Sequence, residues 1–81
     1  AVQPGPAPAP DVVRRVLGLD PGSIRTGWGV VEGKGQTARG VAAGVIRVNE
    51  KAPIAERLAL IYQGVCEVLQ EHNPHAVAVE D

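Results

Sequence analysis

The chain of 81 residues has little cysteine, few aromatic residues and no long apolar run. Its single cysteine, Cys66, excludes an internal disulfide and a zinc site built from cysteines, and it makes the cytoplasm the expected compartment. No apolar run reaches the length of a membrane span and no basic, hydrophobic leader opens the chain, so we expect a soluble protein with no membrane partner. The chain also lacks an initiator methionine and ends abruptly, which indicates an excerpt from a longer protein.

Composition divides the chain into a tail and one domain. The run AVQPGPAPAP has too little apolar bulk to pack, so residues 1–11 are predicted to form a flexible Pro/Ala-rich tail. Residues 12–81 then form a single small domain with a modest core.

The net charge is −1, but the charges are unevenly distributed. Residues 12–47 carry six basic side chains against two acidic ones, whereas residues 48–81 carry two basic side chains against six acidic ones. A basic first half favours a polyanion as the partner of that half. Ordinary solvated faces explain the same counts, so charge alone does not decide the partner.

Hydrophobic periodicity predicts three strands in the first half of the chain. Residues 12–19 are apolar apart from two arginines, as in a strand that is covered on both faces. Residues 26–32 and 38–48 alternate with a period of two, which is typical of strands. Short turns join the three, so an antiparallel meander is expected.

A helix and a fourth strand are predicted after the meander. Pro53 suits a first helical position, an apolar stripe begins at Ile54, and Asn73-Pro74 ends the pattern. Gly64 inside this helix predicts close packing against the sheet. Residues 76–80 return to strand character.

The order of these elements predicts the fold class. A helix after a meander normally returns the chain parallel to an earlier strand through a right-handed crossover. We therefore expect an α/β fold with a three-stranded antiparallel meander, one helix, and a fourth strand parallel to the first.

Two acidic residues, Asp20 and Glu80, stand at the ends of the first and last predicted strands. Adjacent strands lie about 4.8 Å apart, so parallel neighbours would bring both carboxylates close enough to share one metal ion or to bridge two. Two bare carboxylates repel each other unless a cation neutralises them. The alternatives remain open at this point: Asp20-Pro21-Gly22 is also an ordinary turn sequence, and Glu80 is also an ordinary exposed residue after a strand.

An ordered set of motifs resembles the RuvC-type Holliday-junction endonucleases of the ribonuclease H-like superfamily. The opening LGLDPGS (17–23) and TGWGVV (26–31) carry the resemblance first. It continues through GVIR (44–47), IAERL (54–58), IY (61–62) and AVAVE (76–80), and so covers nearly everything after the tail.

The resemblance implies the N-terminal half of a ribonuclease H-like nuclease domain. The enzyme would be a homodimeric, Mg²⁺-dependent endonuclease that cuts four-way DNA junctions by paired nicks in recombination and repair, together with branch-migration motor proteins. Asp20 and Glu80 would be its first two catalytic, metal-binding carboxylates, in a complete site with two ions. The family's other carboxylates lie on a late helix beyond residue 81, so the chain alone is expected to be inactive. Asp81 stands where the family often has Gln.

Three other classes of protein are compatible with the opening motif. Actin-like sugar kinases and ATPases begin with a strand and an Asp-x-Gly turn, but they carry a second phosphate loop far downstream. The YqgF-type nucleases of the same superfamily also have the Asp-x-Gly start. A ribonuclease H-like module that binds nucleic acid without cutting it is the non-enzymatic alternative. A late helix with Asp-x-x-Asp or His-x-x-Asp distinguishes the junction endonuclease from the others.

Overall fold

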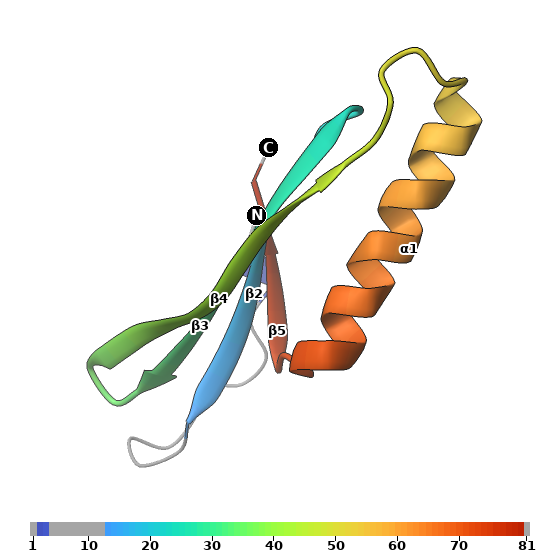
Figure 1. Ribbon diagram of the computed structural model, residues 1–81. Helices are drawn as coiled ribbons and strands as arrows, with labels where there is room; N and C mark the ends of the chain where they lie inside the picture. The colour runs from blue at the N-terminus through green and yellow to red at the C-terminus, as the bar shows by residue number, and fades with distance from the viewer. Residues whose placement is uncertain (1, 4–12, 81) are drawn as a thin grey trace.

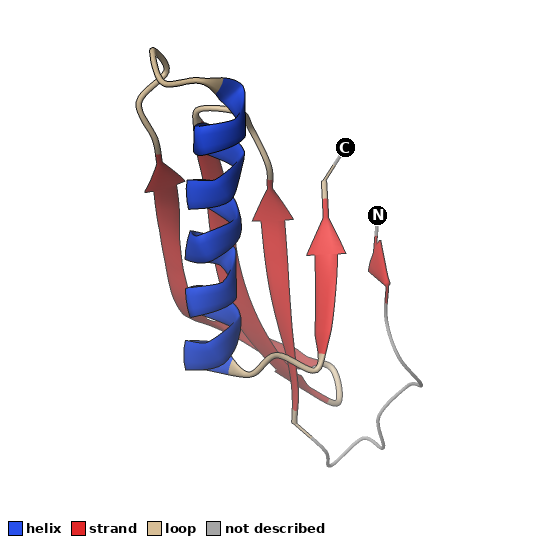
Figure 2. Cartoon of the chain, turned by 90° about the vertical axis from the view of Figure 1, so that its right-hand side faces the viewer, coloured by secondary structure: helices blue, strands red, loops and turns tan. Residues whose placement is uncertain are grey.

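One mixed sheet with one helix laid over it makes up residues 2–3 and 13–80, the part of the chain that the computed structural model describes (Figures 1 and 2). The strands stand in the order β1-β5-β2-β3-β4. In chain order the elements are β1 (Val2–Gln3), β2 (Arg14–Asp20), β3 (Arg25–Lys34), β4 (Thr37–Arg47), α1 (Ile54–His72) and β5 (Ala76–Val79).

The predicted α/β topology is confirmed. Strands β2, β3 and β4 pair antiparallel in chain order, and β5 returns after α1 to pair parallel with β2, where Leu17 stands opposite Val77. The β3–β4 hairpin is longer than predicted because its turn is tight. Gly35 adopts a φ of 61° there, and the Thr37 hydroxyl donates to the carbonyl of Lys34 at 2.8 Å.

The short strand β1 adds an edge that the sequence did not predict. It pairs antiparallel with β5, with Val2 opposite Ala78. The rest of the predicted tail, residues 1 and 4–11, lies outside the described residues. The boundary between tail and domain therefore stays a prediction.

Helix α1 begins one residue later than expected and ends as expected. Pro53 has an extended ψ of 147°, so it is the N-cap rather than the first helical residue. Asn73 ends the helix in the left-handed conformation, and its N–H donates to the carbonyl of Leu69. Within the described part of the chain, no helix is long and apolar enough to cross a membrane.

The core lies between α1 and one face of the sheet (Figure 2). Leu17 of β2 and Val30 of β3 are almost fully buried and form a cluster with Val68 of α1. Leu19 and Trp28 pack against this cluster. Because side chains alternate along a strand, the residues between them, such as Gly18 and Asp20, point to the face that α1 does not cover.

Two glycines leave room for close packing, Gly64 between α1 and the sheet and Gly44 between neighbouring strands of the sheet. A Cβ on Gly64 of α1 would lie 2.9 Å from Cδ1 of Ile46, which confirms the predicted close packing at Gly64. A Cβ on Gly44 of β4 would lie 2.7 Å from Cζ2 of the Trp28 indole. Both contacts are shorter than ordinary van der Waals separations, so a larger residue at either position must displace a packed side chain.

Replacing Gly44 by Ala is expected to lower the free energy of unfolding by about 1–3 kcal/mol because the added methyl overlaps the Trp28 ring. Gly40→Ala is the matched control on the same strand, since nothing lies within 4 Å of a Cβ there. Urea unfolding of both variants in the complete protein checks the difference. Equal midpoints for the two variants would contradict the packing described.

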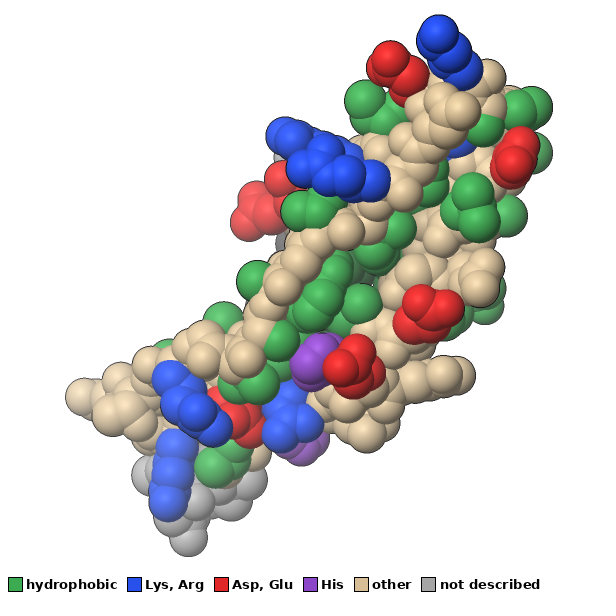
Figure 3. Space-filling view, viewed as in Figure 1, with side chains coloured by type: hydrophobic (Ala, Val, Ile, Leu, Met, Phe, Trp, Pro, Cys, Tyr) green, Lys and Arg blue, Asp and Glu red, His purple; other side chains and the backbone are tan. Residues whose placement is uncertain are grey.

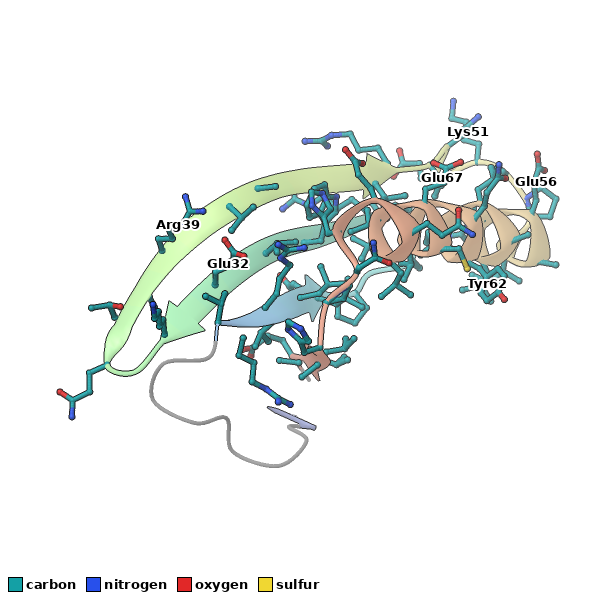
Figure 4. All side chains as sticks on the ribbon, turned by 90° about the horizontal axis from the view of Figure 1, so that it is seen from below. Glu32, Arg39, Lys51, Glu56, Tyr62 and Glu67 are labelled. Atoms are coloured by element: carbon teal, nitrogen blue, oxygen red, sulfur yellow. The ribbon has the colours of Figure 1, made fainter. Side chains whose placement is uncertain are left out.

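An ion-paired cluster occupies the end of the sheet far from Asp20. The Glu32 carboxylate accepts from Arg15 and from Arg39, both at 2.9 Å, and Figure 4 shows Glu32 and Arg39 on the part of the hairpin that extends beyond α1. The hydrogen bond from Arg15 and the two positive charges lower the pKa of Glu32 below its usual value. Glu32 is therefore a neutralised structural acid and not part of the candidate site.

Candidate active site

Asp20 and Glu80 lie side by side at the carboxyl ends of neighbouring parallel strands. The β2–β5 pairing places Leu19 opposite Val79, and the N–H of Glu80 donates to the carbonyl of Leu19 at 2.9 Å. Glu80 therefore follows β5 at the level where Asp20 ends β2. Ligands bind at this edge in open α/β sheets. The strand adjacency predicted from the sequence is confirmed.

Both acids face away from the helix and line one shallow depression. Gly18 stands opposite Ala78 in the β2–β5 pair, and Asp20 and Glu80 each follow these residues by two positions, so all four share one face. Asp20 and Glu80 are both solvent-exposed. Small residues form most of the floor, which leaves the acids accessible; the lining residues are Gly18, Leu19, Asp20, Gly27, Trp28, Gly29, Ala78 and Glu80.

The turn after Asp20 is held by Gly22 and Thr26. A Cβ on Gly22 would lie 2.5 Å from the carbonyl oxygen of Arg25, so only glycine fits there. Thr26 is only 2% exposed, and its hydroxyl accepts from the N–H of Gly22 and donates to the Gly22 carbonyl, both at 3.4 Å. These contacts join the two ends of the turn and limit the movement of Asp20 at its start.

Arg57 connects the same turn to the first residues of α1. Its Nη1 donates to the carbonyl of Ser23 at 3.1 Å, and its Nε donates to the carbonyl of Ala52 at 3.0 Å. From the sequence, Arg57 had no expected role at the site, and Thr26 was expected only to begin a strand. A threonine shortly after the Asp-Pro-Gly turn was the one signal available for Thr26, whereas nothing local indicated the contact of Arg57.

The donor set of the acid pair suits a hard divalent cation. Mg²⁺ binds carboxylate oxygens and keeps water or phosphate oxygens as its other ligands. Within residues 2–3 and 13–80, neither carboxylate has a hydrogen-bond or ion-pair partner, so no protein cation is paired with either acid. The same residues contain no cluster of three or more His, Cys, Asp or Glu that could hold a metal ion. The pair therefore offers part of a coordination shell.

The fold is the ribonuclease H-like class of α/β fold. It consists of a meander of three antiparallel strands, a covering helix, and a parallel strand that brings a second acid beside the first. The chain superimposes on the solved structure titled "T. thermophilus RuvC in complex with Holliday junction substrate" with a TM-score of 0.77 and 40% identity, over 84% of this chain and 42% of that one. It superimposes on a second structure, Thermus thermophilus RuvC, with a TM-score of 0.72 and 43% identity, over 83% of this chain and 42% of that one.

Residues 16–81 match the family of the crossover junction endodeoxyribonuclease RuvC, and the chain belongs to this family. It is 52% identical over 67 residues to the RuvC of Azorhizobium caulinodans, which is 83% of this chain and 40% of that relative. It is 48% identical over 66 residues to the RuvC of Mesorhizobium japonicum, which is 82% of this chain and 39% of that relative. The chain thus spans about two fifths of the length of the curated relatives it matches.

Proposed function

We propose that the protein carrying this chain is a Mg²⁺-dependent endonuclease that resolves four-way DNA junctions by paired phosphodiester hydrolysis in recombination and repair. The observation that carries the proposal is the placement of Asp20 and Glu80 beside each other on an open face of the sheet. Membership of the family supports the reaction, and the relative solved with a Holliday junction substrate supports the class of DNA.

In this proposal Asp20 and Glu80 hold Mg²⁺, in a complete site that binds two ions. A bound Mg²⁺ supplies a lowered pKa for the attacking water and stabilises charge on the phosphate oxygens. The two carboxylates would supply only part of the ligands for two ions, since residues 2–3 and 13–80 contain no cluster of three or more His, Cys, Asp or Glu. The chain alone is therefore proposed to cut junctions weakly or not at all.

The residues around the acids prepare the site for a phosphodiester. The contacts between Thr26 and Gly22 hold the turn that begins at Asp20, which limits where the backbone of Asp20 lies before the substrate binds. Gly27 and Gly29 leave space above the sheet for a sugar-phosphate backbone. The core face, with Leu17 and Val30, keeps the strands that carry the acids in register.

Paired nicks across a four-way junction need two sites, and a dimer with two-fold symmetry supplies them. A homodimer is therefore part of the proposal, as are the cooperation with branch-migration motor proteins and the cytoplasmic location that the sequence analysis predicts. Sedimentation of the complete protein measures the oligomeric state.

The test of the function uses the complete protein, a synthetic four-way junction and a linear duplex of the same arm sequence. We expect nicks in the junction in the presence of Mg²⁺, no nicks with a chelator, and little cutting of the duplex. ATP-dependent phosphorylation of a small substrate without cutting would instead favour the actin-like alternative. Tight junction binding without cutting under all metal conditions would favour the non-catalytic module.

A further inference from the structure

Two arginines stand opposite each other on the face of the sheet that carries the acid pair. In the β3–β4 pairing Arg25 faces Arg47, and two residues further along Gly27 faces Val45. Gly27 is also the partner of Asp20 in the β2–β3 pairing. Because the side-chain period of a strand is two, Arg25, Arg47 and Asp20 all point to the same side of the sheet.

These two arginines lack the partners that other arginines of the chain have. Arg15 and Arg39 are paired with Glu32, and Arg57 donates to two carbonyls. Across residues 2–3 and 13–80, the side chains of Arg25 and Arg47 make no ion pair or hydrogen bond, and both residues are exposed. Like charges directly opposite on one face of a sheet are destabilising, so this arrangement costs stability unless an anion lies between them.

Arg25 lies close to Asp20, and Arg47 stands opposite Arg25 on the next strand. Arg25 and Asp20 line a second depression, together with Pro21, Gly22 and Val45, and this depression shares Asp20 and Gly27 with the one that holds the acid pair. Asp20 pairs directly with Gly27, and Arg25 lies two residues from Gly27 on β3. Arg25 and Asp20 are therefore diagonal neighbours, and the Cα atoms of such neighbours are about 7–8 Å apart. Figure 3 shows Lys and Arg side chains beside Asp and Glu side chains in the upper part of the sheet, where β4 ends. The negatively charged pair Asp20–Glu80 thus lies next to the positively charged pair Arg25–Arg47 on one accessible face of the sheet.

We propose that Arg25 and Arg47 together bind a backbone phosphate of the nucleic-acid strand, next to the phosphate that lies at the Asp20–Glu80 pair. A phosphodiester chain fits both subsites because each of its phosphates is an anion, and a cation at the carboxylates lets one phosphate approach the acids while its neighbour meets the guanidinium groups. Arginine suits this role because its planar group donates two hydrogen bonds to one phosphate. The inference rests on the proposed function and adds to it a binding site for the strand.

The test measures DNA binding apart from cutting. The complete protein and its variants Arg25→Gln and Arg47→Gln are titrated with a labelled four-way junction in chelator, over a series of salt concentrations. Each variant is expected to bind about 3–10-fold more weakly at ~0.1 M salt and to lower the slope of log Kd against log salt by about one. The variants Arg25→Lys and Arg47→Lys keep the charge and are expected to keep most of the slope.

Arg39→Gln is the matched control because Arg39 lies on the same strand as Arg47 but at the far end of the hairpin, paired with Glu32. We expect it to bind like the wild type. The free Arg25→Gln protein is also expected to melt at the same or a higher temperature, since the substitution removes a repulsion. If the wild type cuts junctions but the Arg25→Gln and Arg47→Gln variants bind them as tightly as Arg39→Gln does, this inference is overturned and the proposed function stays intact. A wild type that neither binds nor cuts junctions would overturn both.

Discussion

Replacing Asp20 by Asn in the complete protein is expected to reduce junction cutting on the order of 1,000-fold, because several kcal/mol of transition-state stabilisation depend on a charged ligand at this position. Asn keeps the shape of the side chain but is a neutral, weaker ligand for Mg²⁺. Junction binding in chelator is expected to be equal or stronger, since one negative charge has been removed from the face that meets the DNA. Single-turnover cutting rates and binding titrations on the same preparation measure the two effects.

Glu80→Gln changes the other acid of the pair, on the neighbouring strand, and is expected to reduce the rate of junction cutting by a similar factor. The matched control is Glu56→Gln, which removes an exposed carboxylate from the first turn of α1, outside the depression (Figure 4). A control that keeps the wild-type rate separates the loss of ligands from a general change of charge. If Asp20→Asn or Glu80→Gln cut junctions at the control's rate, the metal role proposed for that residue would be wrong.

Leu17→Ala is expected to lower the free energy of unfolding by about 2–5 kcal/mol, the range for deleting a fully buried leucine side chain. Leu17 is 0% exposed and lies between Val30 and Val68, so its truncation leaves a cavity between the sheet and α1. Chemical unfolding of the complete protein, followed by circular dichroism, measures the change.

Leu58→Ala makes the same chemical change at a helix position that is 55% exposed, and we expect a cost below about 1 kcal/mol there. The difference between the two variants reports the contribution of burial. Similar unfolding midpoints for both would show that α1 does not cover Leu17 in solution.

The sequence predicted the framework of the site because the framework follows from local patterns and general topological rules. The period-two strands, the helix that Asn73-Pro74 ends, and the rule of right-handed crossovers together favoured a last strand beside the first. Asp20 and Glu80 were then placed together without knowledge of any contact. Gly64 was interpreted correctly because a glycine inside a helix has a cost that close packing explains.

Features that depend on register could not be predicted in the same way. The opposition of Arg25 and Arg47 requires the residue-by-residue alignment of β3 with β4, which passes through an irregularity at Val30/Val31. A slip of one residue would place the two side chains on different faces. The contact of Arg57 with Ser23 likewise joins residues 34 positions apart, which no periodic pattern connects.

The parallel pairing of β2 with β5 also has a consequence for the order of folding. The hairpins of the meander close over short loops, whereas pairing β5 with β2 closes a much longer one, so we expect β5 to dock after the meander has formed. Any cation shared by the two acids will bind after that late event and favour the docked state by mass action. Such an ion would therefore stabilise the pairing of β5 with β2, the same pairing that brings Glu80 beside Asp20.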